Sequence, residues 1–531
     1  MKRTSRYGGL TWAALGALLT GVAAIAALIL AQQGNPKYVF VGFTALIVAV
    51  LMPLIGNFRL FCLYSILMLA PLGLRLTFVA YPHMGGAGAL YLEAIDPFLL
   101  ALLFFQVRDR VRGFRGTFRF PLALVLFAML MGLAAAVTIF ASFRTLAFLE
   151  LVRMLKVLLL ALVVLNEVVR RRDFGHAIGA LVLGVILEAG IALTQNVTGA
   201  QLGLGFLGES SDEDIDLLGK TTLEGGEFVY RAGGLLGHSN LLAAYLALLL
   251  PLTIAILLSP ASRLLKALAL VALLLGQPAL VLTLSRGGWL DFLVGLALVL
   301  ALGALHPASR RMFMFARVSI IVAVLVIGAA LSPMIIKRLS QADPSSVKYR
   351  LEWIRTAWAM IGDNPVFGVG LNTYVYSQIP YGEFKTPGEM TEFYGEIWPA
   401  VHNNWLLVWS EQGSLGFLLW VAFHLAVIAA AVRNLRIRDP VMHALGVGLI
   451  GGFAAIMVDG IASFFVRQEA TARMFWIVTA LILALDYWRR LNEEEDVSQQ
   501  PAALASPERL KAPQETIPAG RWLPVRSSFL R

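Results

Sequence analysis

Long apolar runs separated by short polar segments constrain the fold of this 531-residue chain more than any other feature. A helix needs roughly 20 apolar residues to cross a bilayer core of about 30 Å, and runs of about that length recur between residues 10 and 488. Only 14% of the residues are charged, too few to cover the surface of a soluble protein of this size. The sequence therefore predicts an all-α polytopic integral membrane protein.

The apolar runs predict about 12–14 transmembrane helices, and residues 1–488 are expected to form one transmembrane domain. The runs cover residues 10–32, 38–56, 60–80, 90–107, 120–142, 146–165, 174–194, 237–258, 264–284, 289–305, 318–335, 405–432, 441–465 and 470–488. The first run is longer than the apolar core of a signal peptide, so we interpret it as an uncleaved span.

Basic residues determine the predicted orientation of these helices. If the runs alternate from a cytoplasmic N-terminus, every dense basic cluster falls on the cytoplasmic side, as the positive-inside rule requires. The clusters lie at Arg59 and in residues 108–119, 170–172, 263–266, 310–317, 433–438 and 489–490. The net charge of +10 is thus interpreted as a topology signal and not as a sign of nucleic-acid binding. Both termini are expected to be cytoplasmic, with residues 489–531 forming a disordered tail.

The longest polar stretch between two apolar runs covers residues 337–404, on the predicted outer side before the last three helices. Ordered polar loops on a rigid scaffold are common sites of chemistry. Within this loop, Leu351, Ile354, Trp358 and Ile361 recur at helical spacing and predict an amphipathic helix along the membrane surface. An Asn-Pro pair follows and is expected to end that helix.

Several basic residues on the predicted outer side depart from the positive-inside pattern. They are Arg231, Arg286, Lys337, Arg338, Arg350 and Arg355. The planar guanidinium group grips phosphate oxygens through paired, charge-assisted hydrogen bonds, so several arginines converging on one outer cavity would suit a diphosphate head group. The alternative is that each one meets lipid phosphate or pairs locally, as Arg355 would with Glu352.

Two glycine-rich segments place Arg231 and Arg286 next to helix ends. Arg231 begins the sequence RAGGLLGHSN, which leads into a helix that Ser239 or Asn240 is expected to cap. We interpret His238 in this segment as a packing histidine rather than a catalytic one. Arg286 lies in the sequence TLSRGGW between two helices with almost no loop, where a charge is costly unless it faces protein or water. Its alternative role is snorkelling to the membrane interface.

His402 is the predicted proton acceptor of the outer loop. It lies at the start of a helix and is followed by Asn403, and histidine accepts protons near neutral pH. Glu411 and Asp363 are the candidates for orienting its ring, and a purely structural histidine is the alternative. No second histidine lies at metal-ligand spacing and the single cysteine, Cys62, lies in an apolar run. Neither a metal nor another cofactor is therefore expected.

Taken in order, these segments resemble the O-antigen ligase/polymerase (Wzy-C-like) superfamily of bacterial envelope glycosyltransferases. The resemblance covers about residues 231–420. It rests on Arg-x-Gly-Gly…His-Ser-Asn at 231–240, Thr-x-Ser-Arg-Gly-Gly at 283–288, Arg350 with Trp353, Asn-Pro-Val-Phe-Gly-Val-Gly at 364–370, and His-Asn-Asn-Trp…Glu-x-Gly-x-x-Gly at 402–416. The series is specific as a whole, whereas no single piece is.

The resemblance implies a GT-C-like fold with a large periplasmic loop, in the bacterial inner membrane. It implies a glycan linked to undecaprenyl diphosphate as donor, another glycan or a lipid A-core as acceptor, and metal-independent, inverting transfer at the periplasmic face. In this family, residues matching His402 are thought to activate the acceptor hydroxyl, and arginines matching Arg286 and Arg231 to polarise the diphosphate. These three are the predicted catalytic residues. The predicted substrate-binding residues are Arg350, Lys337, Arg338, Arg355, Asn403 and Asn240.

The resemblance leaves the acceptor open between a lipid A-core sugar, another lipid-linked repeat and a protein hydroxyl. The number of spans and the acidic outer segment 210–214 favour a polymerase or ligase of an exported polysaccharide. Membrane lipids and a flippase or chain-length regulator are the expected partners. The competing class is a transporter or flippase of lipid-linked oligosaccharide, which binds the same diphosphate without cleaving it. The concentration of reactive side chains at the outer face favours the enzyme.

Overall fold

The computed structural model describes residues 57–83, 85–141, 143–210, 220–222, 228–318, 344–383, 386–394 and 398–504, together with residue 42. Contacts divide the chain into two compact units, residues 1–487 and 488–531. The expected spans 10–32, 38–56 and 318–335 lie almost entirely outside the described residues, as does the end of the expected tail. Their existence stays a prediction.

Seven described helices are long and apolar enough to cross a membrane, and the predicted polytopic membrane protein is confirmed. They are α7 (Arg171–Thr198), α9 (Ser239–Leu257), α10 (Arg263–Leu282), α11 (Arg286–Gly303), α17 (Asn404–Asn434), α18 (Pro440–Asp459) and α19 (Glu469–Leu504), the last as far as Glu494. The run 146–165 also forms a helix, α6 (Arg144–Glu167), which carries Glu150, Arg153 and Lys156 along its length. The run 120–142 forms the shorter α5 (Leu122–Thr138).

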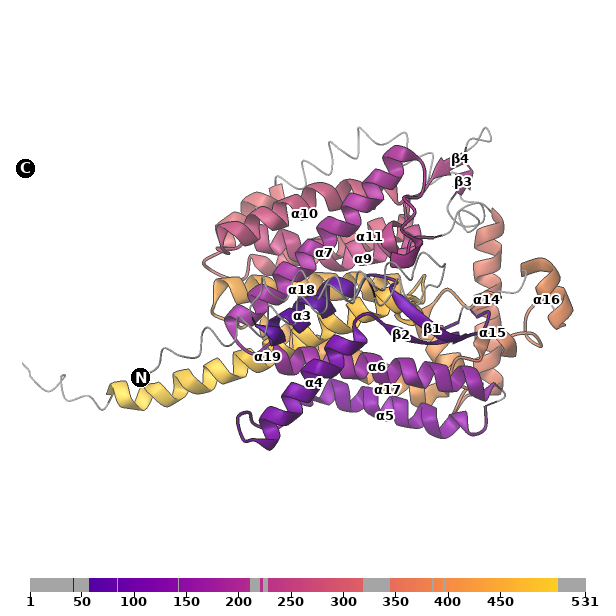
Figure 1. Ribbon diagram of the computed structural model, residues 1–531, viewed down its shortest axis with the longest axis horizontal. Coiled ribbons are helices and arrows are strands. Elements are labelled where there is room, and N and C mark those ends of the chain that lie inside the picture. Colours follow the sequence, from indigo (N-terminus) through magenta and orange to yellow (C-terminus); the bar gives the residue numbers. More distant parts are fainter. Residues whose placement is uncertain are drawn as a thin grey trace, which may run out of the picture. The chain divides into compact units, whose positions relative to one another are not determined.

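The helices pack in two groups, which are visible in Figure 1. α9 lies among α7, α10, α11 and α18, whereas α17 packs against α5, and α5 packs against α6. Because neighbours surround α9 and its sequence is apolar on every side, most of its length is buried. Glycines of α18 let it approach α9 closely, since a Cβ atom on Gly452 would collide with the carbonyl oxygen of Leu248.

The structure corrects two of the expected spans. The run 60–80 is helical only in α3 (Phe58–Leu69), and the run 90–107 contributes to α4 (Asp96–Val111). Between them, β1 (Arg75–Ala80) and β2 (Ala89–Glu93) form an antiparallel hairpin. A helix of 12 residues is about 18 Å long, so α3 reaches only part of the way across a bilayer. A second, shorter hairpin joins β3 (Lys220–Thr222) and β4 (Phe228–Tyr230), and the rest of the described fold is helical apart from loops.

Buried polar contacts hold the chain where α3 ends. The guanidinium group of Arg473 donates hydrogen bonds to the carbonyl oxygens of Ala70 (2.7 Å) and Leu72 (2.8 Å). The same arginine pairs with Glu93, whose carboxylate also lies 2.7 Å from the amine of Lys156. Non-helical backbone at membrane depth is tolerated only where protein buries it or a water-filled cavity receives it. Arg473 supplies that protection at this point.

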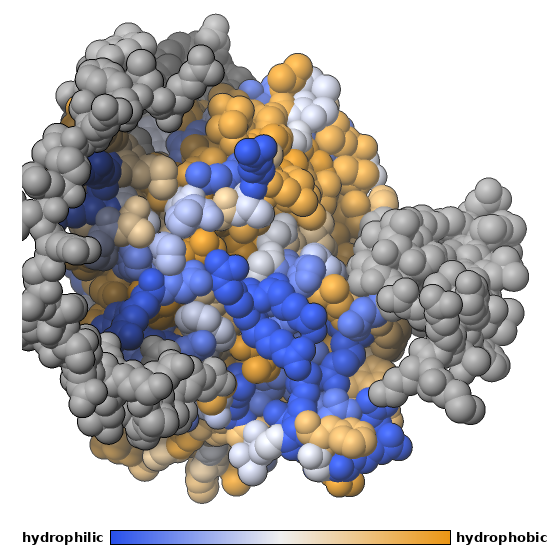
Figure 2. Space-filling view, turned by 90° about the vertical axis from the view of Figure 1, so that its left-hand side faces the viewer, coloured by the Kyte–Doolittle hydropathy of each residue, from blue (hydrophilic) through white to orange (hydrophobic). Residues whose placement is uncertain are grey.

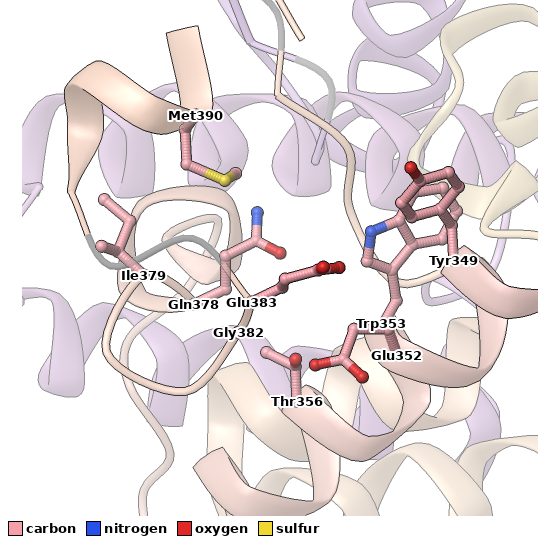
Figure 3. A pocket seen from close by; sticks show the side chains of 9 residues that line it. All are labelled: Tyr349, Glu352, Trp353, Thr356, Gln378, Ile379, Gly382, Glu383 and Met390. Carbon is pink, nitrogen blue, oxygen red and sulfur yellow. The ribbon is translucent and has the colours of Figure 1, made fainter. Parts of the chain in front are cut away.

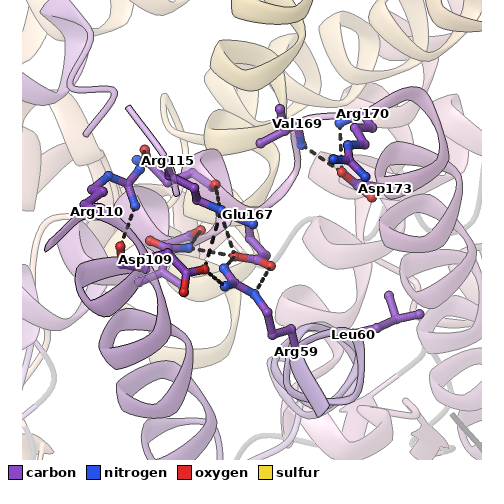
Figure 4. Close-up of polar contacts among 12 residues, drawn as sticks. Arg59, Leu60, Asp109, Arg110, Arg115, Glu167, Val169, Arg170 and Asp173 are labelled. Carbon is purple, nitrogen blue, oxygen red and sulfur yellow. Dashed lines mark hydrogen bonds and ion pairs between the residues drawn. The ribbon is translucent and has the colours of Figure 1, made fainter. Parts of the chain in front are cut away.

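Polar contacts between distant segments fall into the two sets that the alternation of spans predicts. In one set, Arg59 of α3 contacts Asp109 of α4 and Glu167 of α6, with 2.9 Å between Arg59 Nε and Glu167 Oε1 (Figure 4). In the other set, His83 Nε2 donates a hydrogen bond to Asn372 Oδ1 (2.7 Å). Figure 2 views the end of the molecule that carries the tip of α4, where hydrophilic residues gather between hydrophobic flanks. Which set faces the cytoplasm stays a prediction.

α17 is broken at Gly413, where the loop of residues 365–370 crosses it. The backbone of Gly413 is left-handed (φ 62°, ψ −171°), and this break frees helix carbonyl groups for the loop. The N–H group of Val369 donates to the carbonyl oxygen of Ser410 at 2.9 Å. N–H groups of the loop therefore take the place of helix N–H groups as donors to these carbonyl groups. These hydrogen bonds hold the loop against the broken turn of α17.

We expect Gly413→Ala to destabilise the protein by about 3 kcal/mol or more. An alanine Cβ at this positive φ would collide with the carbonyl oxygen of Val366. The loss should appear as a lower midpoint of thermal unfolding in detergent. Gly190→Ala in α7 is the matched control, because nothing lies within 4 Å of its added Cβ. Equal midpoints for the two variants would contradict this role of Gly413.

Candidate active site

The predicted amphipathic helix is present as α14 (Pro344–Asp363), and it ends before the Asn-Pro pair as expected. Figure 1 shows α14 running across the ends of α5, α6 and α17. Its buried face includes Ala357 and Met360, while Trp358 is half exposed. The helix thus lies as a bar over one end of the helices, and its polar side chains face the polar loops there.

His402 lies just before α17, with its ring held between two aromatic side chains. Trp353 of α14 stacks on the ring (centroids 4.9 Å apart, 18°), and Phe464 meets its edge at 5.1 Å. The ring Nδ1 lies 3.0 Å from the carbonyl oxygen of Ala400. Because a carbonyl oxygen only accepts hydrogen bonds, the proton of the neutral ring is on Nδ1. Nε2 then keeps its lone pair and can accept a proton.

Burial and neighbouring cations keep two histidines neutral at this end of the molecule. Burial, with the charge of Arg350 added, lowers the pKa of His402 to about 4. Burial, with the charges of Arg231 and His402 added, lowers the pKa of His238 to about 4 as well. A neutral imidazole at pH 7 is ready to take a proton. An anion bound among these cations would raise both pKa values again.

The three arginines picked out from the motifs interact electrostatically with these rings or with one another. Arg231 donates hydrogen bonds to the carbonyl oxygen of Thr283 and to Asn240 Oδ1, both at 2.9 Å, and so ties its segment to the turn that precedes Arg286. Burial lowers the pKa of Arg350, and the charge of Arg286 lowers it further. Arg286 is therefore electrostatically coupled to Arg350, which is coupled to His402. Their roles in a reaction stay a prediction.

The remaining predicted residues have local contacts. Arg355 is exposed and lies 3.9 Å from Glu352, which is the local pairing considered as its alternative role. Asn403 caps α17, since its Oδ1 accepts from the N–H of Leu406 (2.9 Å). Lys337 and Arg338 lie outside the described residues.

The cap of α9 is His238, and not Ser239 or Asn240 as expected. The ring Nδ1 of His238 accepts a hydrogen bond from the N–H of Asn240 at 3.1 Å. Asn240 lies inside the helix, which begins at Ser239, and its side-chain oxygen accepts a hydrogen bond from Arg231. A neutral His238 therefore carries its proton on Nε2, which fits the packing role expected for it better than a role as base.

The candidates for orienting His402 were wrong. The carboxylate of Glu411 accepts hydrogen bonds from Arg467 (2.6 Å) and from the N–H of Tyr374 (3.2 Å). Asp363 hydrogen-bonds to Tyr381. The ring of His402 is instead oriented by the two aromatic side chains and the carbonyl group described above.

A buried ion-pair network supports the site, and sequence reasoning found only part of it. Glu150 and Arg153 lie three positions apart on α6, a spacing at which opposite charges can pair, and 2.8 Å separates Glu150 Oε2 from Arg153 Nε. Arg467 was missed: it bridges Glu150 (3.0 Å) and Glu411 (2.6 Å) with all three side chains buried. Buried charges need such partners. Through Arg467, the network fixes the segment that carries Phe464 against the ring of His402.

A cavity adjoins the site and encloses about 1750 Å³, including space open to solvent. Its wall includes β1, the segment from Gly208 to Ser210, and Leu235 and Leu236 of the RAGGLLGHSN motif. Arg467 and Gln468 line its other side. The hairpin therefore lines one side of this cavity.

Among the described residues, no group of three or more histidine, cysteine, aspartate or glutamate side chains is arranged to hold a metal ion. The positive charge at the site comes instead from guanidinium groups. That catalysis needs no metal ion stays a prediction.

We expect Arg350→Gln to move the acid limb of the pH–activity profile to higher pH. A histidine base works only when neutral, so activity is lost as pH falls through its pKa. Because Arg350 lowers the pKa of His402, removing its charge should raise that pKa toward the ordinary value of about 6.5. The measurement is the pH dependence of kcat/KM on the residual activity. Lys348→Gln, which removes an exposed cation from the same helix, should leave the limb in place. An unshifted limb in Arg350→Gln would contradict the coupling.

The fold and the site define a multi-pass membrane protein with an arginine–histidine cluster at one end of its helices. Comparison with known proteins finds a family that part of the chain resembles. Residues 268–421 match the family model described as O-antigen ligase, a segment that includes Arg286, Arg350 and His402. This part of the chain is therefore similar to the O-antigen ligase family, which confirms the resemblance predicted from its motifs.

One relative extends the likeness. The protein named O-antigen ligase from Salmonella typhimurium (strain LT2) is 26% identical over 221 residues, which are 38% of this chain and 49% of that protein. The chain thus spans about half the length of this curated relative.

Proposed function

We propose that this protein moves a glycan from undecaprenyl diphosphate to an acceptor hydroxyl at the periplasmic face of the bacterial inner membrane. It would act as a polysaccharide polymerase or as an O-antigen ligase. The observation that carries the proposal is the coupling of Arg286 and Arg350 to a neutral His402 with an available Nε2. Cations for a leaving diphosphate and a base for an attacking hydroxyl are what such a transfer needs.

The arginines would stabilise the departing diphosphate. When the bond between the sugar C1 and the phosphate oxygen breaks, its electron pair stays on the undecaprenyl diphosphate. Arg231, Arg286 and Arg350 place guanidinium groups where that charge develops, and such preorganised donors cost no rearrangement during the reaction. They supply the positive charge that a metal ion supplies in other transferases, so we propose metal-independent transfer.

His402 would act as the general base. Its Nε2 takes the proton of the acceptor hydroxyl while the hydroxyl oxygen forms the new bond to C1, opposite the leaving phosphate, which inverts that carbon. The negative charge of the bound diphosphate offsets Arg350, so the pKa of His402 rises when the donor is present. The base thus becomes stronger in the complex that needs it.

A glycan profile of the cell envelope tests this function. Cells that lack the protein are complemented with the wild type or with His402→Ala. Short repeats that reach their final acceptor without long polymer indicate a polymerase, and polymer that stays on its lipid carrier indicates a ligase. Normal glycans in the His402→Ala strain would contradict the proposal and favour a transporter.

A further inference from the structure

A second opening lies on the other side of Trp353 from the cluster of arginines and His402. It is a small opening, partly open to solvent, and nine residues between 349 and 390 line it. Figure 3 shows Trp353 and Tyr349 on one side of it, with Ile379 and Met390 opposite. The two aromatic rings are tilted by 26° with centroids 6.5 Å apart, so they present a broad apolar wall.

Two carboxylates point into this opening. Glu352 comes from α14 and Glu383 from the loop that follows α15 (Tyr374–Ser377), and Figure 3 shows both directed toward the centre. Their ion pairs are long, 3.9 Å from Glu352 to Arg355 and 3.9 Å from Glu383 to Lys348. Such exposed, long pairs contribute little energy, so both carboxylates can accept hydrogen bonds from a ligand.

The opening shares its walls with the base. The indole of Trp353 lines the opening and also stacks on the ring of His402. Gln378 lines it as well, and its Nε2 donates a hydrogen bond to the carbonyl oxygen of Pro399 (2.9 Å), three residues before His402. A molecule held in this opening would therefore lie one side chain away from the proposed reaction centre.

We propose that this opening is a subsite for one neutral sugar residue of the glycan. A pyranose ring has an apolar C–H face that packs on an aromatic wall, and hydroxyl groups at its rim that donate to carboxylates. Two carboxylates repel a phosphate or an acidic sugar, so the subsite selects against anions. The proposal rests on the proposed function, which supplies a glycan in this place. That glycan belongs either to the donor or to the acceptor.

The test compares two ligands on the full-length protein in lipid nanodiscs. One is the lipid-linked glycan extracted from cells that lack the protein, and the other is undecaprenyl diphosphate alone. The variant is Glu352→Gln combined with Glu383→Gln, which keeps the size of both side chains and removes their charge. Glu392→Gln, an exposed carboxylate on α16 (Pro387–Tyr394), is the control and should bind both ligands as the wild type does.

Weaker binding of the lipid-linked glycan by roughly tenfold or more, with unchanged binding of undecaprenyl diphosphate, assigns the subsite to the donor glycan. If the variant binds both ligands as the wild type does, but its KM for the acceptor glycolipid rises roughly tenfold or more, the subsite belongs to the acceptor. No change in any of the three quantities, or an equal loss for both ligands, overturns the subsite. Binding is measured without turnover, so failure of the proposed transfer by the wild type would appear separately.

Discussion

Replacing His402 by alanine is expected to lower kcat for glycan transfer by about 10²–10⁴-fold. Without the imidazole, no group takes the proton of the acceptor hydroxyl as it attacks. The donor should still bind, because the arginines proposed to hold its diphosphate are unchanged. The measurement is turnover and donor affinity of the purified variant.

His306→Ala is the control for this variant. His306 follows α11 on the predicted cytoplasmic side, where its Nε2 donates a hydrogen bond to the carbonyl oxygen of Arg438 at 2.9 Å. It should keep wild-type turnover. A His402→Ala protein that transfers glycan at the wild-type rate would show that His402 is a structural histidine.

Arg286→Ala should lower kcat by about 10²–10³-fold, the usual effect of removing one donor that stabilises a developing anion. Arg286 is the first residue of α11, and Ser285 caps that helix, so the guanidinium group starts from a fixed backbone. Arg286→Lys should recover only part of the activity, because an ammonium group cannot make the paired hydrogen bonds of a guanidinium.

The matched control is Arg263→Ala, which removes an arginine that also begins a helix, α10, but lies in a predicted cytoplasmic cluster. Its turnover should equal that of the wild type. If Arg286→Ala and Arg263→Ala behaved alike, the diphosphate would have to be held by other residues.

The chemical side chains of the site could be predicted from the sequence because local features mark them. Arg286 lies in a glycine-rich turn, and Arg231 and Arg350 lie in segments predicted for the side of the membrane where basic residues are scarce. His402 lies just before α17, at the end of the loop predicted for the same side of the membrane. These signals need only short stretches of sequence, and the structure brings the four residues into one electrostatic cluster.

The supporting contacts could not be predicted, because they join segments that are far apart. Arg467 and Glu150 are separated by 317 positions, and no local pattern pairs them. The stacking of Trp353 on His402 likewise depends on where α14 lies. Without these contacts, nearby Glu411 was the natural choice for orienting the ring, although its carboxylate faces Arg467.

Hydropathy alone also mistook a hairpin for part of a membrane span. The second half of the run 60–80 is mostly apolar, although Pro71 and Arg75 interrupt it, and residues 75–80 form β1, which pairs with β2. Side chains return to the same face every two residues in a strand and about every 3.6 residues in a helix. Hydropathy summed over a whole run does not retain this period. The signal that marked the change was local, a Pro-Leu-Gly sequence that ends α3 and begins the hairpin.

The most direct test of the account follows the donor itself. Purified protein in nanodiscs is supplied with lipid-linked glycan and acceptor, and released undecaprenyl diphosphate is counted against the newly formed glycan bond. The account predicts one undecaprenyl diphosphate for each bond formed by the wild type, and neither product at a comparable rate with His402→Ala. A donor that crosses the bilayer or stays intact while both proteins bind it would contradict glycan transfer.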